Sequence, residues 1–182
     1  MLPLIYTTPV YTIAFVGVMV YVAIRFEFSF SVGTIVAMFH DLIITLGIFV
    51  LTGRQFSLVT IGAILTVAGY SINDKIVVFD RIREGLHSGR RGTIRSLMND
   101  SINETLSRTV LTSGVTLICM LSLWIFGGSV LDDFAFTNVI GVIIGTYSSI
   151  FIAAPIVLWW TNLRKGNLRH EVVRPRAQAA KA

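Results

Sequence analysis

Charged residues and cysteine are both scarce in this chain of 182 residues. Only 14% of the residues are Asp, Glu, Lys or Arg, against about a quarter in a soluble domain. Ten acidic and fifteen basic residues are too few to cover a water-soluble globule of this length, which argues against an ordinary soluble enzyme. One cysteine, Cys119, can form neither an internal disulfide nor a cysteine-based metal site.

Apolar residues are abundant instead, at 54% of the chain, which excludes an intrinsically disordered protein. They lie in long runs, and about 20 apolar residues are enough for a helix to cross a bilayer. Five runs predict transmembrane helices at 5–24, 31–51, 57–79, 108–127 and 134–160. Pro155 is expected to bend the last of them. The predicted fold is all-α: a polytopic membrane helix bundle of five transmembrane helices plus an interfacial amphipathic helix.

The basic residues gather in two places. The first cluster contains Arg81, Arg83, Arg90, Arg91, Arg95 and Arg108, and the second contains Arg164, Lys165, Arg169, Arg174, Arg176 and Lys181. Because cytoplasmic loops collect Lys and Arg, both clusters are expected to face the cytoplasm, which makes the C-terminus cytoplasmic. The turn with Asp132 and Asp133 then lies outside, and so does Arg54, an exception to the rule. This distribution accounts for the positive charge without nucleic acid as a partner.

The start of the chain is unusual for this topology. Five spans and a cytoplasmic C-terminus place residue 1 outside, yet residues 1–4 carry no positive charge and no cleavage site, so they are not a signal peptide. We therefore expect that a further membrane segment precedes Met1 or is supplied by another chain.

The cytoplasmic loop 80–107 has apolar residues at three- and four-residue steps from Ile94 to Leu106. This spacing predicts an amphipathic helix at 93–107 that lies on the inner membrane face, with Thr93 as its N-cap. The basic tail 161–182 is expected to be disordered.

Several polar residues lie inside the predicted spans, where charge is costly. His40 and Asp41 are near the middle of 31–51. The inner half of 57–79 contains Ser71, Asn73, Asp74 and Lys75, and Arg108 begins the next span. These residues are the candidates for moving a proton.

Asp74 and Arg108 are expected at a similar depth on neighbouring helices. An acid near a movable cation can switch between a protonated and a paired state, and so can carry a proton. The alternative is a static ion pair that fixes helix register. For His40, packing and proton relay are equally favoured, and Lys75 either extends toward the cytoplasm or holds Asp74 ionised.

A repeat of small residues indicates helix packing. Gly141, Gly145 and Ser149 repeat every four residues, which favours close helix contact. The sequence contains no nucleophile constellation, phosphate loop or metal-ligand cluster, so we expect no enzyme activity, no cofactor and no metal.

The polar segment also carries a family resemblance. Residues 69–84 read GYSINDKIVVFDRIRE, which closely resembles the signature of SecF, the bacterial protein-export membrane subunit. Further matches run in order from about residue 10 to 160: His-Asp at 40–41, GRQFSL at 53–58, LSRT at 106–109, LDDF at 131–134 and GTYSSIF at 145–151. The sister subunit SecD shares this architecture.

The resemblance implies a role in the bacterial inner membrane. It implies that a SecD-like subunit, the SecYEG channel and the SecA motor are partners, and that the proton motive force assists export of preproteins across the lipid bilayer. It assigns the proton-responsive acid to Asp74 and its partner to Arg108, with His40, Asp41 and Asn73 as further candidates. Lys75 replaces a small hydroxyl residue usual in the family. The alternatives are a small-molecule or lipid transporter of the same superfamily, and a passive assembly scaffold.

Overall fold

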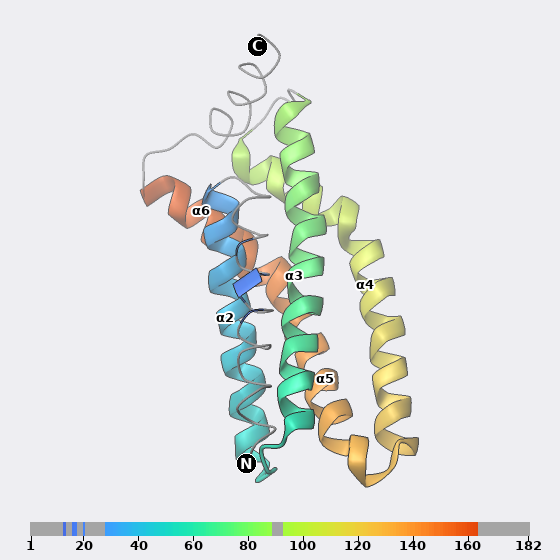
Figure 1. The fold of residues 1–182 in the computed structure, drawn as a ribbon. Coiled ribbons are helices and arrows are strands. Elements are labelled where there is room, and N and C mark those ends of the chain that lie inside the picture. Colours follow the sequence, from blue (N-terminus) through green and yellow to red (C-terminus); the bar gives the residue numbers. More distant parts are fainter. Residues whose placement is uncertain (1–12, 14–15, 18–19, 21–27, 89–92, 164–182) are drawn as a thin grey trace.

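The computed structural model describes residues 28–88 and 93–163, together with the isolated positions 13, 16, 17 and 20. Its helices are α2 (Phe28–Leu51), α3 (Leu58–His87), α4 (Ile94–Phe126), α5 (Gly128–Ser148) and α6 (Ala154–Leu163), with the π-helical turn η1 (Ser149–Ala153) before α6. Within these ranges there is no strand. Helices α2, α3, α4 and α5 form an elongated bundle (Figure 1).

Four helical segments in the described part of the chain are long and apolar enough to cross a membrane. They are Phe30–Leu51, Leu58–His87, Ile94–Phe126 and Gly128–Trp160. Much of the apolar surface lies on the outside of the bundle, since only 11% of the most apolar stretch of α4 is buried. An all-α membrane bundle is therefore confirmed. The predicted helix 5–24 lies largely outside the described residues, and so does the predicted tail 161–182 beyond Leu163.

Helix α3 runs past the predicted boundary at residue 79 to His87. The apolar run ends at Phe79, but no glycine or proline interrupts the next five residues, so the helix continues into its charged segment. Arg81 stabilises this extension, because it donates hydrogen bonds to Glu84 at 2.5 Å and to Glu104 of α4 at 2.6 Å.

The prediction of a separate amphipathic helix at 93–107 is wrong in one respect. This segment and the predicted span 108–127 form one unbroken helix, α4, since no residue between them breaks the backbone hydrogen bonding. Thr93 caps it as predicted, accepting a hydrogen bond from the Ser96 amide. The first part of α4 crosses the end of the bundle before the helix turns along α5 (Figure 1). The Thr105 hydroxyl donates to the Ser101 carbonyl at 3.0 Å near this turn, a bond that commonly bends helices.

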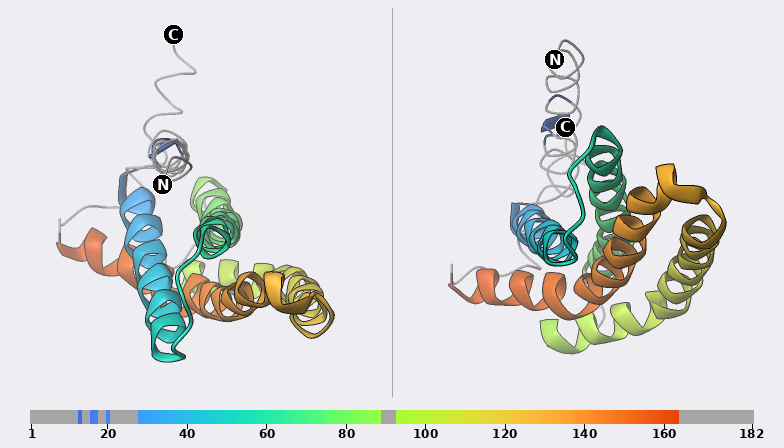
Figure 2. Two further views of the ribbon diagram at one scale, coloured as in Figure 1. Left: turned by 60° about the horizontal axis from the view of Figure 1, so that its bottom comes forward. Right: turned by 90° about the horizontal axis from the view of Figure 1, so that it is seen from below.

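The last predicted span, 134–160, is also subdivided. Helix α5 begins earlier, at Gly128, whose φ of 72° makes the tight turn after α4. Pro155 lacks an amide hydrogen and its ring crowds the carbonyl one turn earlier. The π-helical turn η1 absorbs this conflict, and α6 leaves in a new direction (Figure 2), so the predicted bend is confirmed.

Close helix contacts hold the bundle together. Helix α3 packs against α2, α4 and α5. Gly141 of α5 lies directly against the side chain of Val67 in α3, as the predicted small-residue stripe requires. The rings of Phe30 and Phe79 pack with their centroids 5.3 Å apart between α2 and α3. These contacts set the positions of the polar side chains inside the bundle.

At the end of the bundle that holds the turns 52–57 and 127–128, Arg54 joins the first of these turns to the start of α5. Its guanidinium donates to Asp132 and, at 2.5 Å, to Asp133, and it lies 4.1 Å from the centre of the Phe136 ring. Partial burial disfavours the charged form, but the hydrogen bonds to the two carboxylates outweigh it, so the pKa of Arg54 lies above its ordinary value. This explains why a basic residue is present in a turn predicted to lie outside.

We expect Arg54→Gln to lower the free energy of unfolding by about 1 kcal/mol, because it removes partly exposed ion pairs and a cation–π contact. Arg54→Lys keeps the charge but loses the planar guanidinium and its contact with the Phe136 ring, so its free energy of unfolding should fall by less. SDS-induced unfolding in mixed micelles measures both. Equal stability of all three proteins would contradict this assignment.

Candidate functional site

A buried ion pair joins helices α2 and α3 in the middle of the bundle. The ammonium Nζ of Lys75 lies 2.7 Å from Oδ2 of Asp41, and neither side chain has any exposed surface. Asp41 is near the middle of α2, and Lys75 is in the C-terminal half of α3. Asp41 therefore holds the lysine side chain inside the bundle, and among the described residues Lys75 forms no ion pair with Asp74.

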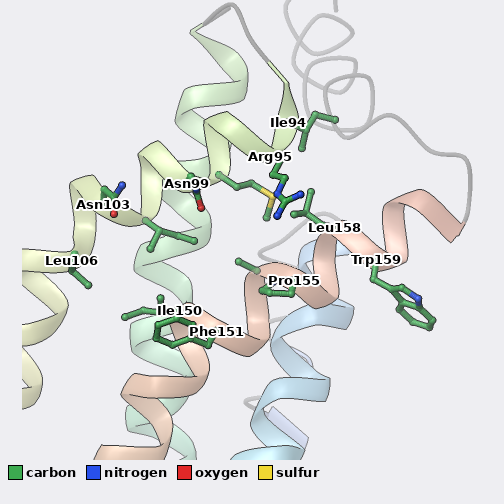
Figure 3. A pocket seen from close by; sticks show the side chains of 13 residues that line it. Ile94, Arg95, Asn99, Asn103, Leu106, Ile150, Phe151, Pro155, Leu158 and Trp159 are labelled. Atoms are coloured by element: carbon green, nitrogen blue, oxygen red, sulfur yellow. The ribbon is translucent and has the colours of Figure 1, made fainter.

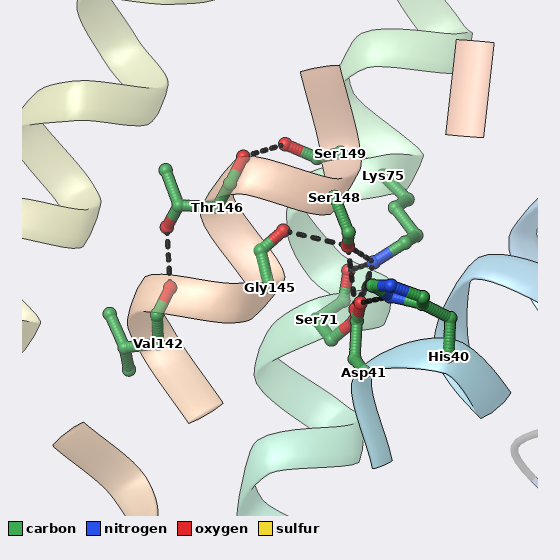
Figure 4. A network of polar contacts seen from close by, with 9 residues as sticks. All are labelled: His40, Asp41, Ser71, Lys75, Val142, Gly145, Thr146, Ser148 and Ser149. Atoms are coloured by element: carbon green, nitrogen blue, oxygen red, sulfur yellow. Dashed lines mark hydrogen bonds and ion pairs between the residues drawn. The ribbon is translucent and has the colours of Figure 1, made fainter. Parts of the chain in front are cut away.

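Two serine hydroxyls complete the site. Ser71, one turn before Lys75 in α3, donates to Asp41 Oδ2 at 2.5 Å, and Ser148 of α5 donates to the same atom at 2.7 Å. Lys75 donates to Ser71 Oγ at 2.6 Å and to Ser148 Oγ at 2.9 Å. With Asp41 as the third acceptor, all three ammonium hydrogens are used. The site therefore joins three helices through one lysine (Figure 4).

His40 connects this buried site to its surroundings. Its Nδ1 lies 3.0 Å from Oδ1 of Asp41, and 32% of the histidine side chain is exposed. Because an ionised carboxylate only accepts hydrogen bonds, Nδ1 carries the hydrogen in this contact. Asp41 is thus bonded on one oxygen to a buried lysine and two serines, and on the other to an accessible imidazole.

Asp74 occupies a different face of α3. Its side chain is 5% exposed, and its Oδ2 has no hydrogen-bond partner among the described residues. The hydroxyl of Tyr70, one turn earlier, donates to Ser113 of α4 at 2.8 Å, which places this face of α3 against α4. Asp74 is therefore buried as predicted.

The predicted Asp74–Arg108 ion pair is absent from the described part of the structure. Arg108 is exposed on α4, whereas Asp74 is buried. A position on a neighbouring helix is not sufficient for contact, because the Arg108 side chain lies on the exposed surface of α4. Asn73 is also exposed and does not reach the Asp41–Lys75 site.

The sequence interpretation missed the contribution of Ser148. A signal was available, because Ser148 lies three residues after Gly145 and seven after Gly141, on the same face of α5 as the small-residue stripe. Similarly, Ser71 and Lys75 are four residues apart on one face of α3. In the described ranges, no group of three or more His, Cys, Asp or Glu could hold a metal ion.

Comparison with known families and proteins agrees with the fold and the sequence pattern. Residues 7–163 match the family model described as protein export membrane protein SecD/SecF, C-terminal. Among curated proteins, the protein translocase subunit SecF of Calditerrivibrio nitroreducens is 55% identical over 152 residues, which cover 82% of this chain and 50% of that protein. SecF of Thermodesulfovibrio yellowstonii is 53% identical over 144 residues, covering 78% and 48%. The chain thus spans about half the length of the curated relatives it matches.

Solved structures are similar over a comparable range. A crystal structure of SecDF in a super-membrane-facing form has a TM-score of 0.76 and 47% identity, and the match covers 90% of this chain and 21% of that one. SecDF from Thermus thermophilus, described as a translocon-associated membrane protein, has a TM-score of 0.76 and 50% identity, with coverage of 79% and 20%. The helix order, the polar segment at 69–84 and the match over residues 7–163 together lead to one conclusion: this chain belongs to the SecD/SecF family of protein export membrane proteins.

Proposed function

We propose that the chain is a SecF-like transport component that couples proton movement to protein export, and that it does so through the Asp41–Lys75 pair. The supporting observation is a fully buried carboxylate that shares one oxygen with a lysine and two serines from three helices. Such a group binds a proton only if its partners rearrange, which links protonation to helix movement.

The proposed step begins at His40. The accessible imidazole can take up a proton at Nε2 and pass the hydrogen on Nδ1 to Asp41 Oδ1, which leaves a neutral imidazole. Once Asp41 is neutral, Lys75 keeps its charge but loses its counter-ion in a site without water exposure. The free energy of that unpaired ammonium favours an arrangement in which Lys75 moves away, carrying α3 relative to α2 and α5. Release of the proton restores the pair.

The membrane potential supplies a sufficient bias. One elementary charge that crosses 100 mV gains about 2.3 kcal/mol, which shifts a two-state equilibrium by roughly fiftyfold. Asp74, buried one residue before Lys75, is a second proton-site candidate. Asn73 and Arg108 remain candidates only for contacts outside this bundle, since both are exposed.

The proposed setting is the bacterial inner membrane, with the C-terminus in the cytoplasm. The supporting observation is that the basic residues of 81–108 and 164–181 lie at one end of the topology predicted from the sequence. The proposed partners are a SecD-like subunit, the SecYEG channel, the SecA motor and exported preproteins, as the family membership implies.

Asp41→Asn tests the proton role. The amide keeps the size and can still accept the serine hydrogen bonds, but it cannot take up a proton. In membrane vesicles that contain the chain assembled with its partner subunits, we expect the part of export that an uncoupler abolishes to disappear, while the remaining export continues. Asp80→Asn is the matched control, because Asp80 is an exposed acid on α3.

Two measurements distinguish the alternatives. Chain abundance in the membrane must remain normal in Asp41→Asn for the export result to count. If the variant is abundant and its uncoupler-sensitive export is unchanged, the proton role of Asp41 is wrong. If abundance falls and export per chain stays constant, the pair serves as a scaffold.

A further inference from the structure

A groove that the proton site does not use lies between the first part of α4 and the segment η1–α6. Its volume is about 840 Å³. It is at the end of the bundle where α4 begins at Ile94 (Figure 3) and α3 ends at His87. The groove is separate from the Asp41–Lys75 site, whose residues do not line it.

The base of the groove is apolar. Met98 is 2% exposed and forms part of the core, with Ile102 and Leu158 packed beside it. Phe151 and Pro155 extend this lining along η1 and the start of α6. Such an apolar surface can bind a hydrocarbon chain, but it offers no hydrogen-bond partners to a small polar solute.

Along α4 the groove also has a polar edge with one sign of charge. Arg95, Asn99 and Asn103 line it from α4. Because they are four residues apart, they form a single stripe along the helix, and all three side chains are exposed. No acidic residue lines the groove. The stripe therefore presents one guanidinium and two amides, which together are complementary to an anion with several acceptor oxygens.

Arg95 has no ion-pair partner among the described residues. Glu104 of the same helix is bonded to Arg81 at 2.6 Å. Trp159 stands at the far side of the groove with 60% of its surface exposed, and tryptophan is enriched where membrane hydrocarbon meets the headgroups. Arg95, the apolar base and the exposed Trp159 thus line one groove.

We propose that this groove binds one anionic phospholipid, with an acyl chain along Met98, Leu158 and Phe151 and the phosphate at Arg95, assisted by the Asn99 and Asn103 amides. Charge complementarity favours this occupant over an apolar protein helix, because a helix would leave the guanidinium unpaired. The neighbouring outer face of α4 is apolar and exposed, so the groove opens toward lipid. This site does not depend on the proton role of Asp41.

The experiment measures lipid retention by the purified full chain in a neutral detergent. Phosphatidylglycerol and phosphatidylcholine with identical acyl chains are compared by native mass spectrometry. We expect phosphatidylglycerol to be retained about fivefold more strongly, and Arg95→Gln to reduce it to the phosphatidylcholine level, since one basic residue near an anionic lipid contributes about that factor. Arg95→Lys should retain most of the preference.

The matched control is Arg108→Gln, which removes an exposed arginine of the same helix that does not line the groove. If Arg108→Gln weakens phosphatidylglycerol retention as much as Arg95→Gln does, the retention reflects general electrostatic attraction, and the proposed lipid site is wrong. Equal retention of both lipids also overturns it. Full competition by inorganic phosphate would identify a phosphate site without the acyl chain, and so reject a lipid.

A photocrosslinking residue at position 99 tests the occupant in native membranes with the partner subunits present. Asn99 is exposed, so the substitution should not disturb folding. A lipid adduct that Arg95→Gln removes supports the proposal. A crosslink to a polypeptide, whether a partner subunit or another segment of this chain, contradicts it.

Discussion

Replacing Lys75 with methionine should lower the free energy of unfolding by about 3–5 kcal/mol. The substitution keeps the length of the side chain but leaves the Asp41 carboxylate buried without its counter-ion, and breaking one side of a buried pair has a cost of this size. Asp41 would retain hydrogen bonds from Ser71, Ser148 and His40, which places the effect below that of a completely isolated charge. The midpoint of SDS-induced unfolding, followed by tryptophan fluorescence, measures it.

A double variant separates stability from proton coupling. Asp41→Leu combined with Lys75→Met replaces both charges by apolar side chains, a change that is often neutral or stabilising. Ser148 can then donate to the Gly145 carbonyl, 3.2 Å away, so its hydroxyl is not left unpaired. We expect the double variant to regain most of the lost stability and to remain without uncoupler-sensitive export.

Arg108→Met serves as the control for the loss of a basic residue. Because Arg108 is exposed, its replacement should lower the free energy of unfolding by less than about 1 kcal/mol. If Lys75→Met is as stable as this control, the Asp41–Lys75 pair does not stabilise the bundle. A double variant with normal uncoupler-sensitive export would refute the proposed coupling while leaving the structural assignment intact.

Gly141→Ala should disrupt the contact between α3 and α5. A Cβ atom at this position would lie 2.2 Å and 2.6 Å from the two γ-carbons of Val67, closer than carbon atoms can approach. Val67 is fully buried and valine has little rotamer freedom in a helix, so the helices must separate. Overpacking of this kind costs about 1–3 kcal/mol. Thermal or SDS unfolding of the purified chain measures the loss.

The neighbouring glycine provides a control for this variant. At Gly145 a Cβ atom would meet Ser71 at 3.5 Å, an ordinary contact, so Gly145→Ala should be tolerated. Adding Val67→Ala to Gly141→Ala should restore more than half of the lost stability, because it removes both clashing methyl groups. Equal stability of the two alanine variants would show that α3 and α5 do not pack through Gly141.

Separation of α3 and α5 has a consequence for the proton site. Ser148 reaches Asp41 from α5, two turns beyond Gly141 on the same face. A shift that relieves the Val67 clash also draws Ser148 away from Asp41 and Lys75. We therefore expect Gly141→Ala to reduce uncoupler-sensitive export more than it reduces chain abundance.

The sequence indicated the membrane segments well where apolar length alone determines them. Helix α2 matches the predicted span 31–51 within three residues, because a long apolar run bounded by polar turns leaves few alternatives. It was less informative where the apolar run and the helix end at different residues. Helix α3 continues past Phe79 through charged residues, and α4 joins a charged and an apolar part, since helix formation depends on the backbone while membrane burial depends on the side chains.

By itself the sequence determined the class of the molecule, the residues too polar for hydrocarbon and the family to which they belong, because composition, run length and motif spacing are properties of one dimension. The partners of those polar residues were decided only by the tertiary structure. Asp41, Ser71, Lys75 and Ser148 lie up to 107 positions apart, and which of two adjacent residues, Asp74 or Lys75, enters the site depends on how α3 is rotated. Packing at Gly141 and Gly145 sets that rotation, and a difference of one residue, about 100° around the helix, separates one pairing from the other.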